Sequence, residues 1–151
     1  MRSSSSDVYA DTVTFSFYGA QYESRYLAFQ SVEFSDRNHQ PLEQPDARQL
    51  ALFQQFDAPP YAPSSGGIPF FYMDGRYLQL GAPFNPGLLK NMPWDEAVGQ
   101  IKQKNTPLSR QVMGVANLYT AALCKLTAGK PAQVCTAPAI KAAAADLPNA
   151  S

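Results

Sequence analysis

The chain has 151 residues, of which 45% are hydrophobic and 16% charged, and this is the composition of one globular domain rather than of a disordered chain. Twelve Lys and Arg residues balance twelve Asp and Glu residues, so no global field attracts nucleic acid, anionic lipid or acidic substrates. No stretch is long and apolar enough to span a bilayer, and the N-terminus has no signal-peptide core. We therefore expect neither a nucleic-acid partner nor a membrane span.

The N-terminal third predicts a β-hairpin. Residues 1–12 are a polar lead-in, after which apolar and polar residues alternate from Val13 through Phe17. A period of two indicates a strand with one buried face. Gly19-Ala20 fits a type II′ turn with glycine in the first central position, and residues 21–34 follow as a second run rich in aromatic and branched residues.

The middle of the chain predicts a short helix between two irregular segments. Residues 35–45 are polar and irregular, and Asp46 is a plausible N-cap for a helix that ends at Phe56, with apolar residues at helical spacing at Leu50, Phe53 and Phe56. Residues 58–67 are dominated by proline, serine and glycine, so we expect an exposed loop there.

A second hairpin follows that loop. Two runs rich in β-forming residues, Phe70–Met73 and Arg76–Leu80, flank Asp74-Gly75. This dipeptide accepts the positive φ angles of a type I′ turn. The pattern therefore predicts a tight antiparallel hairpin.

The last third predicts two helices. One carries the stripe Trp94, Ala97, Val98 and Ile101, with Pro93 suited to its first turn. The other begins with Ser109 as its cap, runs to Leu126 with an apolar face, and is ended by Gly129-Lys130-Pro131.

Two groups of residues resemble a known family. Gly67-Ile68-Pro69, a strand, a turn glycine and a second strand that ends at Gly81 resemble the second half of a thioredoxin fold. The more specific group is Trp94-Asp95, Ala116-Asn117-Leu118-Tyr119-Thr120-Ala121-Ala122-Leu123-Cys124-Lys125-Leu126-Thr127, Lys130-Pro131-Ala132 and Val134-Cys135. With residues 3–9 and 14–17, they resemble the thioredoxin-like family catalogued as domain of unknown function 929, from about Ser3 to Cys135.

The resemblance implies an α/β fold of the thioredoxin-like type, incomplete at its N-terminal end. Its expected parts are an N-terminal β-hairpin, a central helix, a proline-led antiparallel hairpin and two C-terminal helices. Residues 1–12 are then the lead-in, 13–136 a partial thioredoxin-like domain, and 137–151 an Ala-rich tail whose sequence does not decide between frayed helix and disorder.

The chain departs from the family pattern at the position of the chemistry. Family members usually carry a strand and helix with a Cys-x-x-Cys motif upstream of the segment that resembles residues 3–9, and no Cys-x-x-Cys occurs in this sequence. Thioredoxin chemistry needs a thiolate of lowered pKa at a helix N-terminus and a resolving thiol one turn away. We therefore expect an N-terminally truncated form whose sheet lacks the strand between its second strand and the proline-led hairpin, which leaves raw edges.

Three functions follow as hypotheses. The first is a member of an uncharacterised family related to thiol–disulfide oxidoreductases that has no redox activity in this form. The second is a non-enzymatic module that binds a peptide or protein at the Pro69 loop. The third is a fragment of a complete redox enzyme with a wrongly assigned start, which upstream DNA encoding a strand and Cys-x-x-Cys would establish.

Ile68 and Pro69 are the candidate substrate-loop residues. In the resembling family the proline at this position is cis and its loop lies beside the active dithiol. The alternative is an ordinary trans-proline that opens an edge strand. The hairpin that follows and the wider resemblance favour the cis form, in which the Ile68 backbone could bind an extended peptide by β-addition.

Cys124 and Cys135 allow three interpretations. A structural disulfide would close a loop of roughly 12 residues and contribute about 3 kcal/mol in the chain-entropy model. A redox-active pair would need a low-pKa thiolate, which the dipole opposes late in a helix. Two reduced cysteines are the third possibility, expected in a cytoplasm. We favour the structural disulfide, which would suit the extracytoplasmic or membrane-tethered setting that the resemblance implies.

No residue pattern predicts a cofactor or a metal. His39 is the only histidine, it lies in a polar segment, and no Cys, His and carboxylate cluster accompanies it. A hydrolase triad is unsupported, because the serines lack a second histidine or a Gly-x-Ser-x-Gly elbow.

Overall fold

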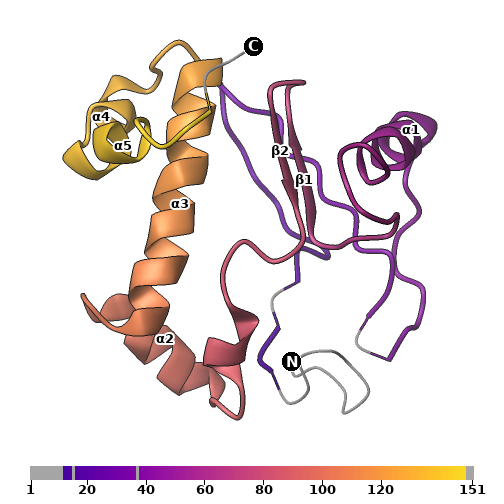
Figure 1. Cartoon of the computed structure of the whole chain (residues 1–151), viewed down its shortest axis with the longest axis horizontal. Helices are drawn as coiled ribbons and strands as arrows, with labels where there is room; N and C mark the ends of the chain where they lie inside the picture. Colours follow the sequence, from indigo (N-terminus) through magenta and orange to yellow (C-terminus); the bar gives the residue numbers. More distant parts are fainter. Residues whose placement is uncertain (1–11, 15, 37, 149–151) are drawn as a thin grey trace.

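The computed structural model describes residues 12–14, 16–36 and 38–148. The lead-in up to residue 11 and Phe15 of the predicted first strand lie outside the described residues. The fold is mixed α/β, as expected, with a two-stranded antiparallel sheet and five α-helices in the described part (Figure 1). In chain order the elements are α1 (Ala47–Phe56), β1 (Phe70–Met73), β2 (Tyr77–Leu80), the 3₁₀ helix η1 (Pro86–Leu89), α2 (Trp94–Lys102), α3 (Pro107–Leu126), α4 (Ala132–Cys135) and α5 (Pro138–Ala143).

The proline-led hairpin forms as predicted. β1 and β2 pair in the register Phe70↔Leu80 to Met73↔Tyr77. Asp74 and Gly75 take φ values of 49° and 72°, the positive signs of a type I′ turn, and the Arg76 N–H donates to the Met73 carbonyl at 3.1 Å. Because Arg76 closes the turn, β2 begins at Tyr77 and not at Arg76.

One face of the hairpin packs against α1. Asp46 caps this helix as predicted: its carboxylate accepts the Gln49 N–H at 2.8 Å, and the Gln49 side chain accepts the Asp46 N–H in return. Phe70 and Tyr72, which share a face of β1, meet rings of α1 with centroid distances of 5.3 and 5.0 Å; their partners are Phe53 and Phe56.

The opposite face of the hairpin packs against the C-terminal helices. The Phe71 ring lies 5.3 Å from that of Tyr119 on α3, and Met73 and Tyr77 pack onto a cluster from α3 and the following segment: Ala121, Ala122, Ile140 and Leu147. Figure 1 shows α1 and α3 on opposite sides of the hairpin. The alternation of side chains along β1 therefore produces three layers.

The N-terminal β-hairpin predicted over residues 13–34 is wrong. In the described part of this segment no strand forms, and Thr12 makes an isolated antiparallel bridge with Lys90. A turn does form, but the Ala20 N–H donates to the Phe17 carbonyl at 2.8 Å and Gly19 (φ 69°) occupies the second central position. The predicted type II′ turn on Gly19-Ala20 is therefore also wrong.

The contacts of Phe17 explain why no hairpin forms there. Its N–H donates to the Glu33 carboxylate at 2.8 Å, and its carbonyl accepts the Ser31 hydroxyl at 3.4 Å. Its ring packs edge-on against Phe29 (5.4 Å), which also contacts Tyr22 (6.1 Å). Side chains thus bond the backbone groups that a partner strand would need, and the rings pack on one another as an aromatic cluster of Phe17, Tyr22 and Phe29.

The two predicted C-terminal helices form as α2 and α3, but Ser109 is not the cap of α3. The cap is Thr106, whose hydroxyl accepts the Ser109 N–H at 3.0 Å, with Pro107 in the first turn. Ser109 is buried and its hydroxyl donates to the Ile101 carbonyl at 3.1 Å, which ties α3 to α2. Leu89, Ala97 and Leu108 form a second buried cluster at this junction.

The Ala-rich tail, for which the sequence left helix and disorder open, contains α5. Its Ile140 is buried against α3, and Leu147 beyond the helix joins the same cluster. No helix in the described ranges is long and apolar enough to cross a membrane.

Candidate functional site

The candidate substrate loop lies between α1 and β1. Gly66 has a φ of 87°, a left-handed value that favours glycine, and the Ile68–Pro69 peptide bond is cis. The Ile68 side chain is 69% exposed, the highest value among the large hydrophobic side chains that the structure describes as exposed. At the far end of the loop, the Pro69 carbonyl accepts the Gly81 N–H at 2.9 Å, so the loop is anchored to the residue that follows β2.

A buried carboxylate lies beneath this loop. Asp57 follows the last residue of α1 and is only 1% exposed. Its Oδ2 accepts the Gly66 N–H at 2.6 Å, whereas its Oδ1 has no hydrogen-bond partner among the described residues. A Cβ on Gly67 would lie 3.0 Å from that Oδ1. Glycine at position 67 therefore lets the chain pass directly over the carboxylate.

Sequence reasoning missed Asp57. The available signal is an acidic residue directly after a helix and before a long Pro/Gly segment. The burial of that residue, however, depends on how the segment folds back over it.

The two edges of the sheet differ. In the described part of the chain, the sheet contains β1 and β2 alone, so no strand pairs with the outer edge of either. On β2 the Leu80 carbonyl accepts the side-chain amide of Gln79 at 3.0 Å. No described side chain bonds the outer edge of β1 in this way. Unpaired strand edges are templates for an added strand, and among the described residues the β1 edge lacks a side-chain bond like the one that Leu80 accepts on β2.

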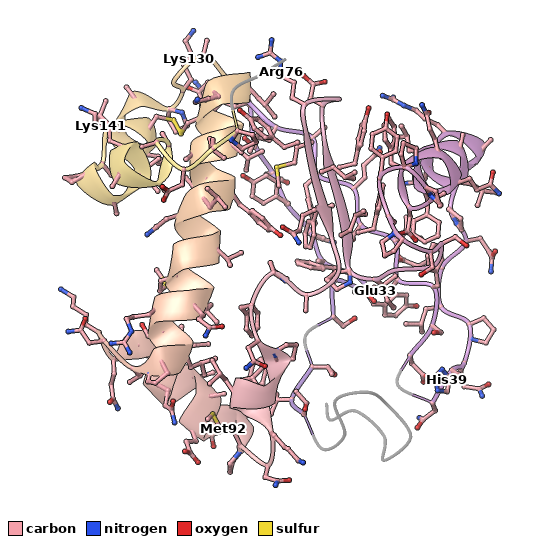
Figure 2. All side chains as sticks on the ribbon, viewed as in Figure 1. Glu33, His39, Arg76, Met92, Lys130 and Lys141 are labelled. Atoms are coloured by element: carbon pink, nitrogen blue, oxygen red, sulfur yellow. A yellow bond between two sulfur atoms is a disulfide. The ribbon has the colours of Figure 1, made fainter. Side chains whose placement is uncertain are left out.

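Cys124 and Cys135 are joined in a disulfide that links the last turn of α3 to the end of α4 (Figure 2). No described cysteine is free. Cys124 packs on the cluster that also receives Met73 and Tyr77, so the bridge lies near the turn end of the hairpin. Pro69 lies at the other end of β1. The structure therefore does not bring the cysteines to the candidate substrate loop.

Tyr119 holds a second buried polar atom that lacks a hydrogen-bond partner in the described structure. Its phenolic oxygen is buried on α3, and this burial raises the pKa of Tyr119 to about 12. Its ring contacts Phe71 of β1, so we assign Tyr119 to the packing between layers.

The remaining candidates have ordinary explanations. His39 is exposed, at the periphery of the molecule (Figure 2), and its N–H closes a turn onto the Asp36 carbonyl at 3.0 Å. Within the described residues no group of His, Cys, Asp and Glu could hold a metal ion.

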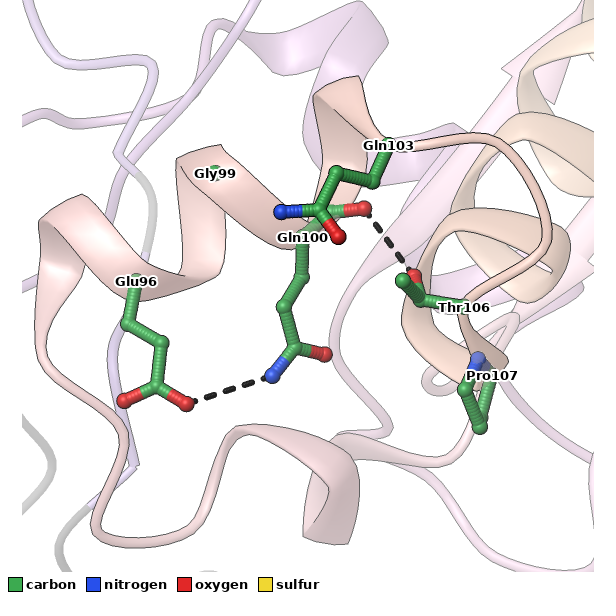
Figure 3. Close-up of a pocket in the computed structure, with 6 residues that line it drawn as sticks. All are labelled: Glu96, Gly99, Gln100, Gln103, Thr106 and Pro107. Carbon is green, nitrogen blue, oxygen red and sulfur yellow. Dashed lines mark hydrogen bonds between the residues drawn. The ribbon is translucent and has the colours of Figure 1, made fainter.

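An open hollow of about 520 Å³ lies between α2 and the start of α3 (Figure 3). Its walls bond to each other: the Gln100 amide donates to Glu96 at 3.2 Å, and the Thr106 hydroxyl donates to the Gln100 carbonyl at 2.9 Å. The hollow is lined by Glu96, Gly99, Gln100, Gln103, Thr106 and Pro107.

The fold thus defines a mixed α/β protein whose hairpin is covered by helices on both faces, with a glycine–proline loop over a buried carboxylate. Residues 1–125 match the model of one family, described as domain of unknown function (DUF929). The chain belongs to this family. No curated protein and no solved structure matches the chain.

Proposed function

We propose that this protein derives from thiol–disulfide oxidoreductases of thioredoxin-like fold and that this chain has no redox activity of its own. The observation that carries the proposal is the state of its two cysteines. They are eleven residues apart, they are bonded to each other, and they join α3 to α4 instead of flanking a helix N-terminus. A dithiol catalyst needs an accessible thiolate of lowered pKa with its resolving partner one turn away.

The layered arrangement supports the thioredoxin-like part of the proposal. In such folds a proline-led antiparallel hairpin lies between helices on both faces of the sheet, and here α1 and α3 cover opposite faces of β1 and β2. The outer edge of β1, which no described strand pairs with, is where a further strand would pair. We propose that in a longer form of this protein the strand before a Cys-x-x-Cys helix occupies that edge.

An insulin-reduction assay tests the absence of redox activity. With dithiothreitol as reductant, we expect this chain to leave the rate of insulin B-chain precipitation at the level of reductant alone. Refolding of scrambled ribonuclease should likewise stay at its uncatalysed rate. Turnover in either assay would overturn this part of the proposal, and a known thioredoxin serves as the positive control.

The longer form has its own test. The DNA upstream of the first codon should encode, in frame, a strand followed by Cys-x-x-Cys, and the intact mass of the protein from its native source should include that segment. An in-frame stop codon directly upstream would remove the longer form from the proposal.

A second function, a non-enzymatic interaction module, is favoured by the exposure of Ile68. Ile68 is 69% exposed on a loop anchored at Pro69, and the neighbouring edge of β1 has no partner strand among the described residues. Together they offer an apolar contact and backbone hydrogen bonds. We propose that an extended polypeptide binds there by strand addition to β1.

Reduced, carboxymethylated α-lactalbumin, which stays unfolded, is a suitable probe for this second function. We expect it to bind the wild-type chain and to bind Ile68→Ser at least about tenfold more weakly, because the apolar contact is lost. Val134→Ser is the matched control, since Val134 is also an exposed apolar residue but lies on α4. Equal weakening by both substitutions, or no binding by the wild type, would contradict an interaction at this loop.

A further inference from the structure

The Asp57 carboxylate is energetically unexpected where it lies. Burial of a carboxylate is costly unless hydrogen bonds or counter-charges compensate. Asp57 is 1% exposed, yet among the described residues its carboxylate accepts a single hydrogen bond, from the Gly66 N–H, and Oδ1 has no partner. An apolar residue of similar size would avoid this cost. Stability alone therefore does not account for an aspartate at this position.

The geometry of the loop shows what the carboxylate does. The bond from Gly66 to Asp57 Oδ2, at 2.6 Å, is a charge-assisted bond to backbone, and it joins residues nine apart in the sequence. It holds Gly66 at a φ of 87°. The next residue, Gly67, crosses so close to Oδ1 that a Cβ would come to 3.0 Å. The Asp57 carboxylate therefore contacts both glycines: Oδ2 binds the Gly66 N–H, and Oδ1 lies against Gly67.

The loop is consequently hydrogen-bonded at both ends. Gly66 is held by Asp57, and the Pro69 carbonyl is held by the Gly81 N–H at 2.9 Å. Ile68 lies between these two anchor points and is the residue that the loop exposes. A binding element whose ends are fixed loses less conformational freedom when a partner orders it, which is how pre-organisation raises affinity.

We propose that Asp57 is the positioning residue of the 66–69 loop: its buried carboxylate fixes Gly66 and thereby sets how Ile68 is presented to an extended polypeptide. The proposal rests on the interaction function above. It assigns no contact between Asp57 and the partner, because the carboxylate is covered by the loop that it holds.

The Gly66 amide reports the loop geometry without any partner. In ¹⁵N-labelled full-length protein, Asp57→Ala should accelerate hydrogen exchange of this amide by on the order of tenfold or more, because a bond to a charged acceptor is lost. Asp46→Ala is the matched control: it removes a carboxylate that accepts a backbone N–H at the opposite end of α1 and should leave the Gly66 amide unchanged. Unchanged Gly66 exchange in Asp57→Ala would overturn the proposal.

A variant that keeps the charge tests the same geometry from the other side. Gly67→Ala places a Cβ against Oδ1 and should disturb Gly66 exchange in the wild-type background. In the Asp57→Ala background the same substitution should do so much less, because the clashing oxygen is gone. Independent, additive effects of the two substitutions would overturn the close approach. If Asp57→Ala folds poorly, Asp57→Asn takes its place in the exchange measurement, because it keeps an acceptor of the same shape without the charge; it should still accelerate exchange of the Gly66 amide, and unchanged exchange would overturn the proposal.

Binding of carboxymethylated lactalbumin separates this proposal from the one on which it rests. If the wild type binds, Asp57→Ala should weaken binding by about tenfold per folded molecule, and Asp46→Ala should not. Undiminished binding by Asp57→Ala would overturn the positioning role. If the wild type does not bind, the interaction function fails, and the Gly66 amide alone decides whether Asp57 sets the loop.

Discussion

The N-terminal and C-terminal halves of the described chain bury their apolar residues in different ways. Seven of the nine buried hydrophobic residues lie at or beyond Leu89, and five of these are Leu or Ala on helices that pack closely. Nine of the twelve exposed large hydrophobic residues precede Trp94, and six of these are aromatic residues in the segment 17–34.

The difference concerns cover rather than apolar content. In the N-terminal half the rings contact each other, as in the aromatic cluster of Phe17, Tyr22 and Phe29, but little lies over them. In the C-terminal half the small side chains of Ala97, Ala121 and Ala122 are at most 2% exposed, so water is excluded from the contacts between helices. We infer that most of the free energy of unfolding is held by the helices, and that the hairpin is stabilised mainly by the rings of α1 and α3 on its two faces.

A pair of identical substitutions tests this comparison most strongly. Leu108→Ala, at a residue 1% exposed, should lower the free energy of unfolding by about 2–5 kcal/mol. Leu50→Ala, at a residue 40% exposed on α1, should cost less than about 1 kcal/mol. Urea unfolding followed by far-ultraviolet circular dichroism measures both. Equal costs would show that the N-terminal half is as well covered as the C-terminal one.

Removal of the disulfide should weaken the helical half next. The double substitution of Cys124 and Cys135 by serine opens a loop of about 12 residues and should cost about 3 kcal/mol in the chain-entropy model. The same urea experiment with and without dithiothreitol on the wild-type chain provides the control. If amides of β1 and β2 lose more hydrogen-exchange protection than those of α3, the division into halves is wrong.

The helix caps give smaller effects in both halves. Thr106→Ala removes the hydroxyl that accepts the Ser109 N–H, and Asp46→Ala removes one side of the capping box of α1. Each should cost about 1 kcal/mol. Differential scanning calorimetry should show Thr106→Ala lowering the main transition, whereas Asp46→Ala should chiefly accelerate exchange of α1 amides. A reversed pattern would place the cooperative core around α1.

The smallest effect at neutral pH is expected at the boundary between the halves. Burial raises the pKa of Tyr119 from the ordinary 10.0 to about 12, so the folded chain holds its phenolic proton more tightly than the unfolded chain does. The stabilisation is complete below pH 10 and is lost as pH rises from about 10 to about 12. Tyr119→Phe should therefore match the wild type closely at pH 7 and lose less stability across that alkaline range. Parallel curves for the two proteins would contradict this assignment.

Local signals predicted the elements whose contacts are local. Asp46 was recognisable as a cap, Asp74-Gly75 as a type I′ turn and the Trp94 stripe as a helix face, because each depends on residues within one or two turns. The same period-of-two pattern was misleading at Val13–Phe17. Alternation indicates that a segment is extended, but a strand also needs a partner segment, which lies far away in the sequence. Here the side chains of Ser31 and Glu33 bond the backbone of Phe17 instead.

In the candidate site, too, sequence reasoning identified the residues that lie in local motifs and missed the one whose burial depends on long-range folding. Ile68, Pro69 and the two cysteines were identifiable from motifs, and the structure places the first pair on the loop and the second in the disulfide. The burial of Asp57 was not predictable, because it arises only when residues 58–67 fold back over the end of α1. Ser109 was misassigned as a cap because its hydroxyl makes a long-range bond. That hydroxyl donates to the Ile101 carbonyl, while Thr106, three residues earlier, accepts the Ser109 N–H as the true cap.

The alternating contacts of the four β1 residues affect how this family can evolve. Phe70 and Tyr72 contact α1, whereas Phe71 and Met73 contact the helices that include Tyr119. Adjacent positions in one short strand are therefore subject to selection from opposite sides of the molecule. In an alignment of homologues, we expect positions 70 and 72 to co-vary with residues of α1, and positions 71 and 73 to co-vary with residues of α3. Neighbouring positions of β1 should therefore change independently of each other.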